Sequence, residues 1–115
     1  MNATNMPERV SQLQKRKEKV ASTLQHLAGE QAELEKSSDW IDRAAYESRI
    51  QMFERLNEWY LHELREIEDA LDRISGDKYG RCLACHNSIE TSRLDFFPQA
   101  AFCSACQAMR EALEP

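Results

Sequence analysis

The sequence has no long apolar run, few aromatic residues and no excess of basic charge. No stretch approaches the roughly 20 apolar residues that a membrane-spanning helix needs, so no membrane segment is predicted. Residues 1–10 lack the basic-then-apolar pattern of a secretion signal, which argues against a disulfide-stapled secreted domain and favours a cytoplasmic protein. With 115 residues, 30% charged and 8% aromatic, the chain is one domain's worth of sequence with little material for a large core.

Clustered positive charge and catalytic groupings are also missing. The formal net charge is −5, whereas contacts to nucleic-acid phosphates need grouped Lys and Arg, so we expect no direct sequence-specific DNA binding. The one basic run, residues 15–19, is short and is interpreted as a solvated helix face. No histidine or serine has an evident triad partner, so the sequence predicts a protein that is not an enzyme.

Four cysteines in two Cys-x-x-Cys pairs are what the sequence does have. Cys82-x2-Cys85 and Cys103-x2-Cys106 are separated by 17 residues, a spacing typical of a structural tetrathiolate site. Each pair offers two thiolates from one tight turn, and the four together complete a tetrahedron around Zn²⁺. Because no position stays open for water or substrate, the spacing predicts one structural zinc ion.

Other interpretations of these cysteines stay open. An iron–sulfur cluster or a single iron also accepts four thiolates. Two separate redox pairs are a further alternative, although no βαβ pattern surrounds either pair. His86 follows a cysteine directly, and we interpret it as a turn residue that tolerates positive φ and not as a fifth metal donor.

Two segments with apolar residues at every third or fourth position precede the cysteines. They extend from Pro7 to about Lys36 and from about Trp40 to Ser75, and they have the signature of a two-stranded coiled coil. The first apolar set is Val10, Leu13, Val20, Leu24, Leu27 and Leu34. The second is Tyr46, Ile50, Phe53, Tyr60, Leu64, Ile67, Leu71 and Ile74. Lys17, Gln31 and Asn57 fill the remaining positions of these seams.

The turn chemistry at residues 37–39 favours an antiparallel hairpin within one chain, centred between Ser38 and Asp39, over a dimer built on the same repeats. The predicted fold is therefore all-α and monomeric. It has a long coiled-coil hairpin in residues 1–75, with its tip at about 37–44. A small four-cysteine zinc finger and a short C-terminal helix follow in residues 76–115.

Several smaller predictions concern packing around the finger. Gly76 is expected to cap the second helix. A small apolar core of the finger is expected from Ile89, Leu94, Phe96, Phe97 and Phe102. A helix over residues 104–113 is expected to pack Met109 and Leu113 on the base of the hairpin. The stripe Met52, Leu56 and Trp59 is expected to cover the finger's base or the C-terminal helix, with a partner surface as the alternative.

Asp39 and Asp42 begin the second predicted helix. Physically they suit an N-cap and N3 pair, since both carboxylates lie near the positive end of the helix dipole. By helix rise they lie ~50 Å from the cysteine end. An acidic tip on a thin rod is suited to a narrow channel that is basic or contains a metal ion.

Residues 70–82 (ALDRISGDKYGRC), together with Ile89, Arg93-Leu94, Pro98 and Cys103-Ser-Ala-Cys106, resemble the DksA/TraR-type C4 zinc-finger proteins. The tip, Asp39-x-x-Asp42-Arg43-Ala44, is also similar to theirs, and the likeness covers nearly the whole chain from the first helix onward. Members of this family bind bacterial RNA polymerase and insert their coiled coil into its secondary channel, where they change open-complex stability. The resemblance implies that Asp39, Asp42 and Ala44 are functional tip residues.

Two departures from the family pattern concern guanosine tetraphosphate (ppGpp). The N-terminal segment is short compared with that of the longer DksA proteins, in which it helps form a ppGpp site. The positions that are basic there correspond to Glu66, Phe97 and Gln107 here, so a phosphate-rich ligand meets less positive charge. Two other functions stay as alternatives: a transcript-cleavage factor like the Gre proteins, and a generic zinc-stapled adaptor.

Overall fold

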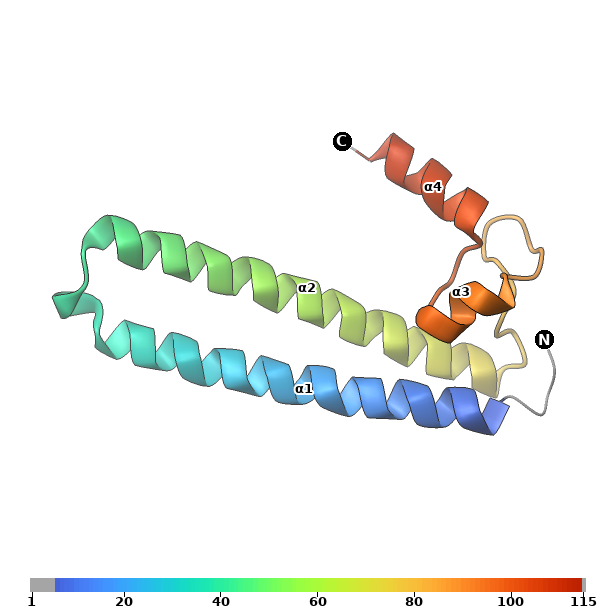
Figure 1. The fold of residues 1–115 in the computed structure, drawn as a ribbon, viewed down its shortest axis with the longest axis horizontal. Helices are drawn as coiled ribbons and strands as arrows, with labels where there is room; N and C mark the ends of the chain where they lie inside the picture. Colours follow the sequence, from blue (N-terminus) through green and yellow to red (C-terminus); the bar gives the residue numbers. More distant parts are fainter. Residues whose placement is uncertain (1–5, 115) are drawn as a thin grey trace. The chain divides into compact units, whose positions relative to one another are not determined.

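The computed structural model describes residues 6–114. Its elements are α1 (Met6–Lys36), the 3₁₀ helix η2 (Ser38–Trp40), α2 (Arg43–Ser75), α3 (Thr91–Phe96) and α4 (Ser104–Leu113) (Figure 1). Within these described residues the only β-pairing is one isolated antiparallel bridge, between Arg81 and Ser88. The all-α prediction is therefore confirmed. None of the described helices has the length and hydropathy of a membrane span.

The chain divides into two compact units. We call residues 17–65 the hairpin unit, and the described parts of residues 1–16 and 66–115 the finger unit. The domain boundary predicted between residues 75 and 76 falls where α2 ends, and as a boundary between domains it stays a prediction.

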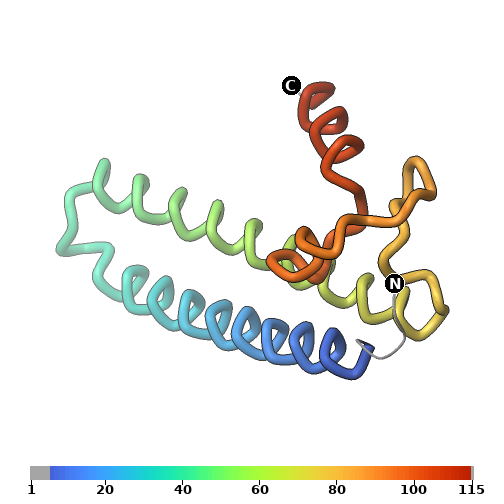
Figure 2. The backbone as a smooth tube through the Cα atoms, turned by 45° about the vertical axis from the view of Figure 1, so that its right-hand side comes forward, coloured from blue at the N-terminus to red at the C-terminus, as the bar shows by residue number. Residues whose placement is uncertain are grey.

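The hairpin unit consists of two antiparallel helical segments joined by a short turn (Figures 1 and 2). Its seam residues are the least exposed, as the apolar repeat predicts: Val20 and Leu34 are buried, and Leu24, Leu27, Phe53 and Tyr60 are partly buried. Of the polar members of the seams, Lys17 and Asn57 are exposed and Gln31 is partly buried. Burial of the apolar stripe is therefore what holds the two segments together.

The turn spans residues 37–42 and contains the predicted centre. The expectation that α2 begins near Trp40 is wrong: Trp40 ends η2, and the extended backbone of Ile41 (φ −108°, ψ 138°) interrupts the helical path. The Asp42 carbonyl accepts the first intrahelical bond, from Tyr46 N at 2.9 Å, and the Asp42 Oδ2 accepts from Ala45 N at 3.3 Å. Asp42 is therefore the N-cap of α2, and the predicted assignment of that position to Asp39 is corrected.

The finger unit has its own core, made of residues from α1, α2 and the cysteine loop. Leu13, Ile67, Ala70 and Leu94 are almost fully buried, and Ile89 is close to it. Two of the expected members of this core are not in it: Phe96 and Phe97 are exposed. The reason is that α3 has only six residues, so its single buried position, Leu94, takes the inward face while the residues at its end remain outside.

Arg9 joins the first helix to α3. Its guanidinium is buried, forms an ion pair with Asp95, and donates to the Leu94 carbonyl at 3.3 Å. Gln12 Nε2 donates to the Asp95 carbonyl at 3.1 Å. These contacts place a cation at the C-terminal end of α3, where the helix carbonyls carry partial negative charge.

Helix α2 ends in a Schellman motif. Lys78 N donates to the Arg73 carbonyl at 2.8 Å and Asp77 N to the Ile74 carbonyl at 3.2 Å, the two bonds that define this cap. Gly76 occupies the C-cap position, as predicted, whereas the left-handed residue is Asp77, with φ 56°. The chain thereby turns from the helix into the loop that carries the first cysteine pair.

The packing predicted for Met109 and Leu113 of α4 is wrong, because both side chains are mostly exposed. In the stripe on α2, Trp59 is mostly exposed, Met52 is 44% exposed and Leu56 is partly buried, and what the stripe contacts stays a prediction. α4 is held instead through its first turn, and through Arg110, whose guanidinium lies 4.3 Å from the centre of the Phe102 ring. The physical reason is that a ten-residue helix fixed at one end leaves its far turns in solvent, whatever the spacing of its hydrophobic residues.

Candidate metal centre and hairpin tip

The first cysteine pair sits in a tight backbone turn. Cys82 N donates to the Asn87 carbonyl at 2.8 Å, and His86 N donates back to the Cys82 carbonyl at 3.0 Å. His86 adopts φ 65°, which confirms its interpretation as a turn residue. The turn buries Cys82 and leaves Cys85 exposed.

The second pair forms the start of α4. Cys103 is the N-cap of this helix, and its sulfur accepts a hydrogen bond from Cys106 N at 3.5 Å. The two residues therefore stand at the start of α4, close to N–H groups that the first turn of a helix leaves unpaired. Leu83 N donates to the Ala101 carbonyl at 2.9 Å and so connects the two pairs.

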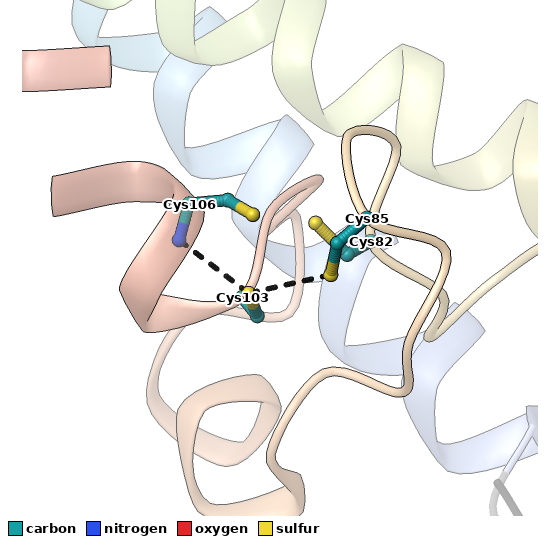
Figure 3. A group of neighbouring side chains, drawn as sticks. All are labelled: Cys82, Cys85, Cys103 and Cys106. Atoms are coloured by element: carbon teal, nitrogen blue, oxygen red, sulfur yellow. Dashed lines mark hydrogen bonds between the residues drawn. The ribbon is translucent and has the colours of Figure 1, made fainter. Parts of the chain in front are cut away.

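The four sulfur atoms converge on one point, as Figure 3 shows, and all lie within 4.8 Å of one another. Cys85 Sγ and Cys103 Sγ are 3.8 Å apart. Tetrahedral coordination with Zn–S bonds of about 2.3 Å gives sulfur–sulfur separations of about 3.8 Å. The residues therefore fit a tetrathiolate metal site, and these four cysteines can hold a metal ion.

The thiols do not share one electrostatic environment. Burial raises the pKa of Cys82, but backbone N–H groups, first that of Cys85, outweigh it and lower the pKa to about 6. Hydrogen bonds to the Cys103 and Cys82 sulfurs raise the pKa of Cys106 to about 12. The protein thus favours the thiolate of Cys82 and disfavours that of Cys106, and a bound cation would favour the ionised form of Cys106.

Three side chains that the sequence analysis gave no role hold the segment before the second pair. Arg73 Nη2 donates to the carbonyls of Gln99 and Ala100, at 3.3 and 3.4 Å. Arg93 Nε donates to the Phe102 carbonyl at 3.0 Å. Tyr79 Oη donates to the Pro98 carbonyl at 2.7 Å, and burial raises the pKa of Tyr79, which keeps the phenol protonated as a donor.

A fourth supporting residue is Glu90. Its carboxylate accepts from Ser104 Oγ at 2.8 Å and from Ser104 N at 3.4 Å, so it satisfies an N–H group at the start of α4. Arg73, Tyr79, Arg93 and Pro98 all fall within the stretches on which the family resemblance was recognised. Their place in these stretches is the sequence signal that could have pointed to their supporting role.

The predicted tip residues lie in and beside the turn of the hairpin unit. Asp39 is in η2, Asp42 caps α2 and Ala44 is in the first turn of α2, and all three are exposed. Asp39 accepts no hydrogen bond from the described residues, so its charge is free for a partner, whereas Asp42 has a capping bond.

The three positions compared with a ppGpp site all belong to the finger unit. Phe97 follows α3 and is exposed, and Gln107 Nε2 donates to Glu111 Oε1 at 3.0 Å on α4. Glu66 lies on α2 and is partly buried.

A helical hairpin with an exposed acidic turn and a four-cysteine cluster defines a class of protein seen elsewhere. The structure matches that of transcription factor DksA2 from Pseudomonas aeruginosa, with a TM-score of 0.85 and 26% identity, covering 96% of this chain and 86% of that one. The chain is accordingly DksA-like in fold.

The sequence agrees with this match. The protein named RNA polymerase-binding transcription factor DksA from Escherichia coli is 28% identical over 98 residues, covering 85% of this chain and 63% of the relative. The Haemophilus influenzae protein of the same name is 28% identical over 97 residues, covering 84% and 65%. The chain thus spans less than two thirds of these relatives' length. No protein-family model matches the sequence. In sequence and in structure the chain is therefore similar to the DksA proteins.

Proposed function

We propose that this protein is a non-enzymatic regulator of transcription that binds bacterial RNA polymerase and inserts its hairpin turn into the polymerase's secondary channel. The proposal is carried by the structural match, which includes 96% of the chain and hence both the hairpin and the cysteine cluster. The matched relatives of known name are RNA polymerase-binding transcription factors. Such a partner places the protein in the bacterial cytoplasm, where it acts as a monomer.

The turn supplies the regulatory chemistry in this proposal. Asp39 and Asp42 bring negative charge to the end of the hairpin, and the small side chain of Ala44 allows close approach of the partner. At the active-site region of polymerase these carboxylates change the stability of open complexes. The rest of the hairpin and the finger supply affinity and orientation.

The cysteine cluster has a structural role in this proposal. Cys82, Cys85, Cys103 and Cys106 hold one Zn²⁺, which, when bound, joins the two cysteine turns and leaves no open coordination position. The site with its metal carries a charge of −2, which the backbone N–H groups of both turns partly offset.

The test is to measure polymerase binding and open-complex lifetime on the same preparations of Asp39→Asn and Asp42→Asn. Asparagine caps helices about as well as aspartate, so both variants should fold as the wild type does and still compete for core polymerase. We expect each to lose most of the effect on open-complex lifetime.

Glu35→Gln is the matched control, because it removes one exposed carboxylate near the end of α1 and should leave the effect intact. Wild-type protein that does not bind polymerase would overturn the proposed function. Stimulation of transcript cleavage by the wild type, lost in both aspartate variants, would favour the Gre-like alternative.

A further inference from the structure

Trp40 is an exposed indole in the turn of the hairpin unit. Its side chain is 89% exposed, although tryptophan is mostly buried in folded proteins. It ends η2, whose backbone is closed by the bond from Trp40 N to the Ser37 carbonyl at 2.9 Å. This bond joins backbone atoms only, so it fixes the position of Trp40 in the turn without any contact from the indole.

Packing of the turn does not need this indole. The neighbouring Ile41 is partly buried and, with Leu34 and Phe53, lines an open pocket of about 440 Å³ on the hairpin unit. Ile41 is thus the more buried of the two apolar side chains in the turn. The Trp40 side chain remains outside it and is free to meet a partner.

The charges around Trp40 indicate what kind of partner fits. The two nearest basic side chains in sequence are engaged within their own helices: Lys36 Nζ lies 3.3 Å from Glu33 Oε1, and Arg43 Nε lies 3.0 Å from Glu47 Oε1. Asp39 is exposed and has no cation of this chain beside it among the described ion pairs. The turn therefore carries an exposed indole and, at the preceding residue, an exposed carboxylate with no cation beside it among the described ion pairs.

We propose that Trp40 and Asp39 together bind one arginine or lysine side chain of the partner. An indole attracts a cation lying over its face within about 6 Å, and a neighbouring carboxylate adds a charge-assisted hydrogen bond. Tryptophan and arginine are also the residues most enriched at the energetic centres of interfaces. The inference rests on the proposed function, because the partner surface is that of RNA polymerase.

The first test is competition binding to bacterial core polymerase with three substitutions at one position. Trp40→Phe keeps an aromatic face, Trp40→Leu keeps apolar volume only, and Trp40→Ala removes both. We expect Trp40→Leu and Trp40→Ala to weaken binding about tenfold, and Trp40→Phe about threefold or less, since tryptophan is the strongest cation–π partner and phenylalanine a weaker one. Unchanged unfolding midpoints should accompany all three, because the side chain is exposed.

The second test is a double-mutant cycle of Asp39→Asn with Trp40→Leu. If both side chains bind the same cation, the combined loss of affinity is smaller than the product of the single losses. The matched control is a cycle of Asp39→Asn with Trp59→Leu, which removes the other exposed indole. By helix rise, Trp59 lies about 24 Å along α2 from the first residue of that helix. In this control cycle, the loss of affinity of the double variant should equal the product of the two single losses.

The outcomes separate the two proposals. A wild-type protein that does not bind polymerase overturns the proposed function. If the wild type binds, equal affinity of Trp40→Leu and wild type overturns the cation-binding role of Trp40. Multiplicative losses in the Asp39 and Trp40 cycle overturn the claim that they share one cation.

Discussion

At the scale of single residues, the same turn contains one aspartate that supports the fold and one that does not. Asp42 Oδ2 accepts from Ala45 N, so it satisfies one of the N–H groups left unpaired at the start of α2. Asp39 has no such bond among the described residues. Charge and capping can therefore be separated by substitution.

We expect Asp42→Ala to lower the free energy of unfolding by about 1 kcal/mol, the usual cost of losing an N-cap, and Asp42→Asn to leave it nearly unchanged. Urea unfolding followed by circular dichroism measures both. Asp39→Ala is the control and should cost less than about 0.5 kcal/mol, as exposed substitutions do. A larger loss for Asp39→Ala than for Asp42→Ala would show that the cap is wrongly assigned.

A second residue-scale prediction concerns Leu13, which is fully buried in the finger unit. Leu13→Ala should cost roughly 2–5 kcal/mol, because it removes buried apolar atoms and leaves a cavity. Lys15→Ala, two positions along the same helix and exposed, is the matched control. Equal unfolding midpoints for the two variants would contradict the core as described.

At the scale of elements, the finger depends on contacts that the long helices do not need. Its loop is held by the Arg73 and Arg93 guanidinium groups and by the Tyr79 hydroxyl, while α4 is fixed through Glu90 and the cysteines. The helices α1 and α2, with 31 and 33 residues, form their backbone hydrogen bonds mainly within themselves.

Metal removal should therefore affect the two parts differently. Purified protein should contain about one zinc per chain, as a closed four-thiolate site requires. A strong chelator should expose the amides of residues 81–106 to hydrogen exchange while most of the helical circular dichroism persists. Iron in the metal analysis, or two disulfides in freshly prepared protein, would contradict the zinc assignment. A chelated protein that loses all its helix would contradict the independence of the hairpin.

At the scale of the whole molecule, the acidic charge decides which ligands the protein attracts. The net charge of −5 and the uncharged or acidic side chains at positions 66, 97 and 107 disfavour a polyphosphate. We propose on this ground that the protein acts with little dependence on ppGpp.

The measurement is promoter-specific transcription with and without ppGpp, using a polymerase that lacks any ppGpp site of its own. We expect the protein's effect to change less than about twofold, because one missing ionic contact to a phosphate already weakens binding by more than that. A variant with Glu66→Lys and Gln107→Arg restores positive charge and is the informative comparison. Strong synergy between ppGpp and the wild type would contradict the prediction.

The sequence by itself determined the two long helices, the last helix and the four cysteines that the structure brings together. Apolar residues at every third or fourth position specify long helices, because a helix brings these positions to one face. The spacing of the cysteine pairs predicts one four-sulfur cluster, and in the structure the four sulfurs lie within 4.8 Å of one another. The turn was located as well, although the start of α2 was placed three residues too early.

Only the tertiary structure decided which apolar side chains are buried and which polar side chains support the site. Apolar side chains are usual in a core, yet four of them are exposed here: Phe96, Phe97, Met109 and Trp59. The reason is that burial depends on what packs against the face that carries the side chain. That is a property of distant parts of the chain. The roles of Arg9, Arg73 and Tyr79 were hidden for the same reason, since each bonds to backbone carbonyls 19 to 85 residues away in sequence. The apolar repeat of a helix can be recognised from residues close together in sequence, whereas these long-range contacts form only when the chain folds.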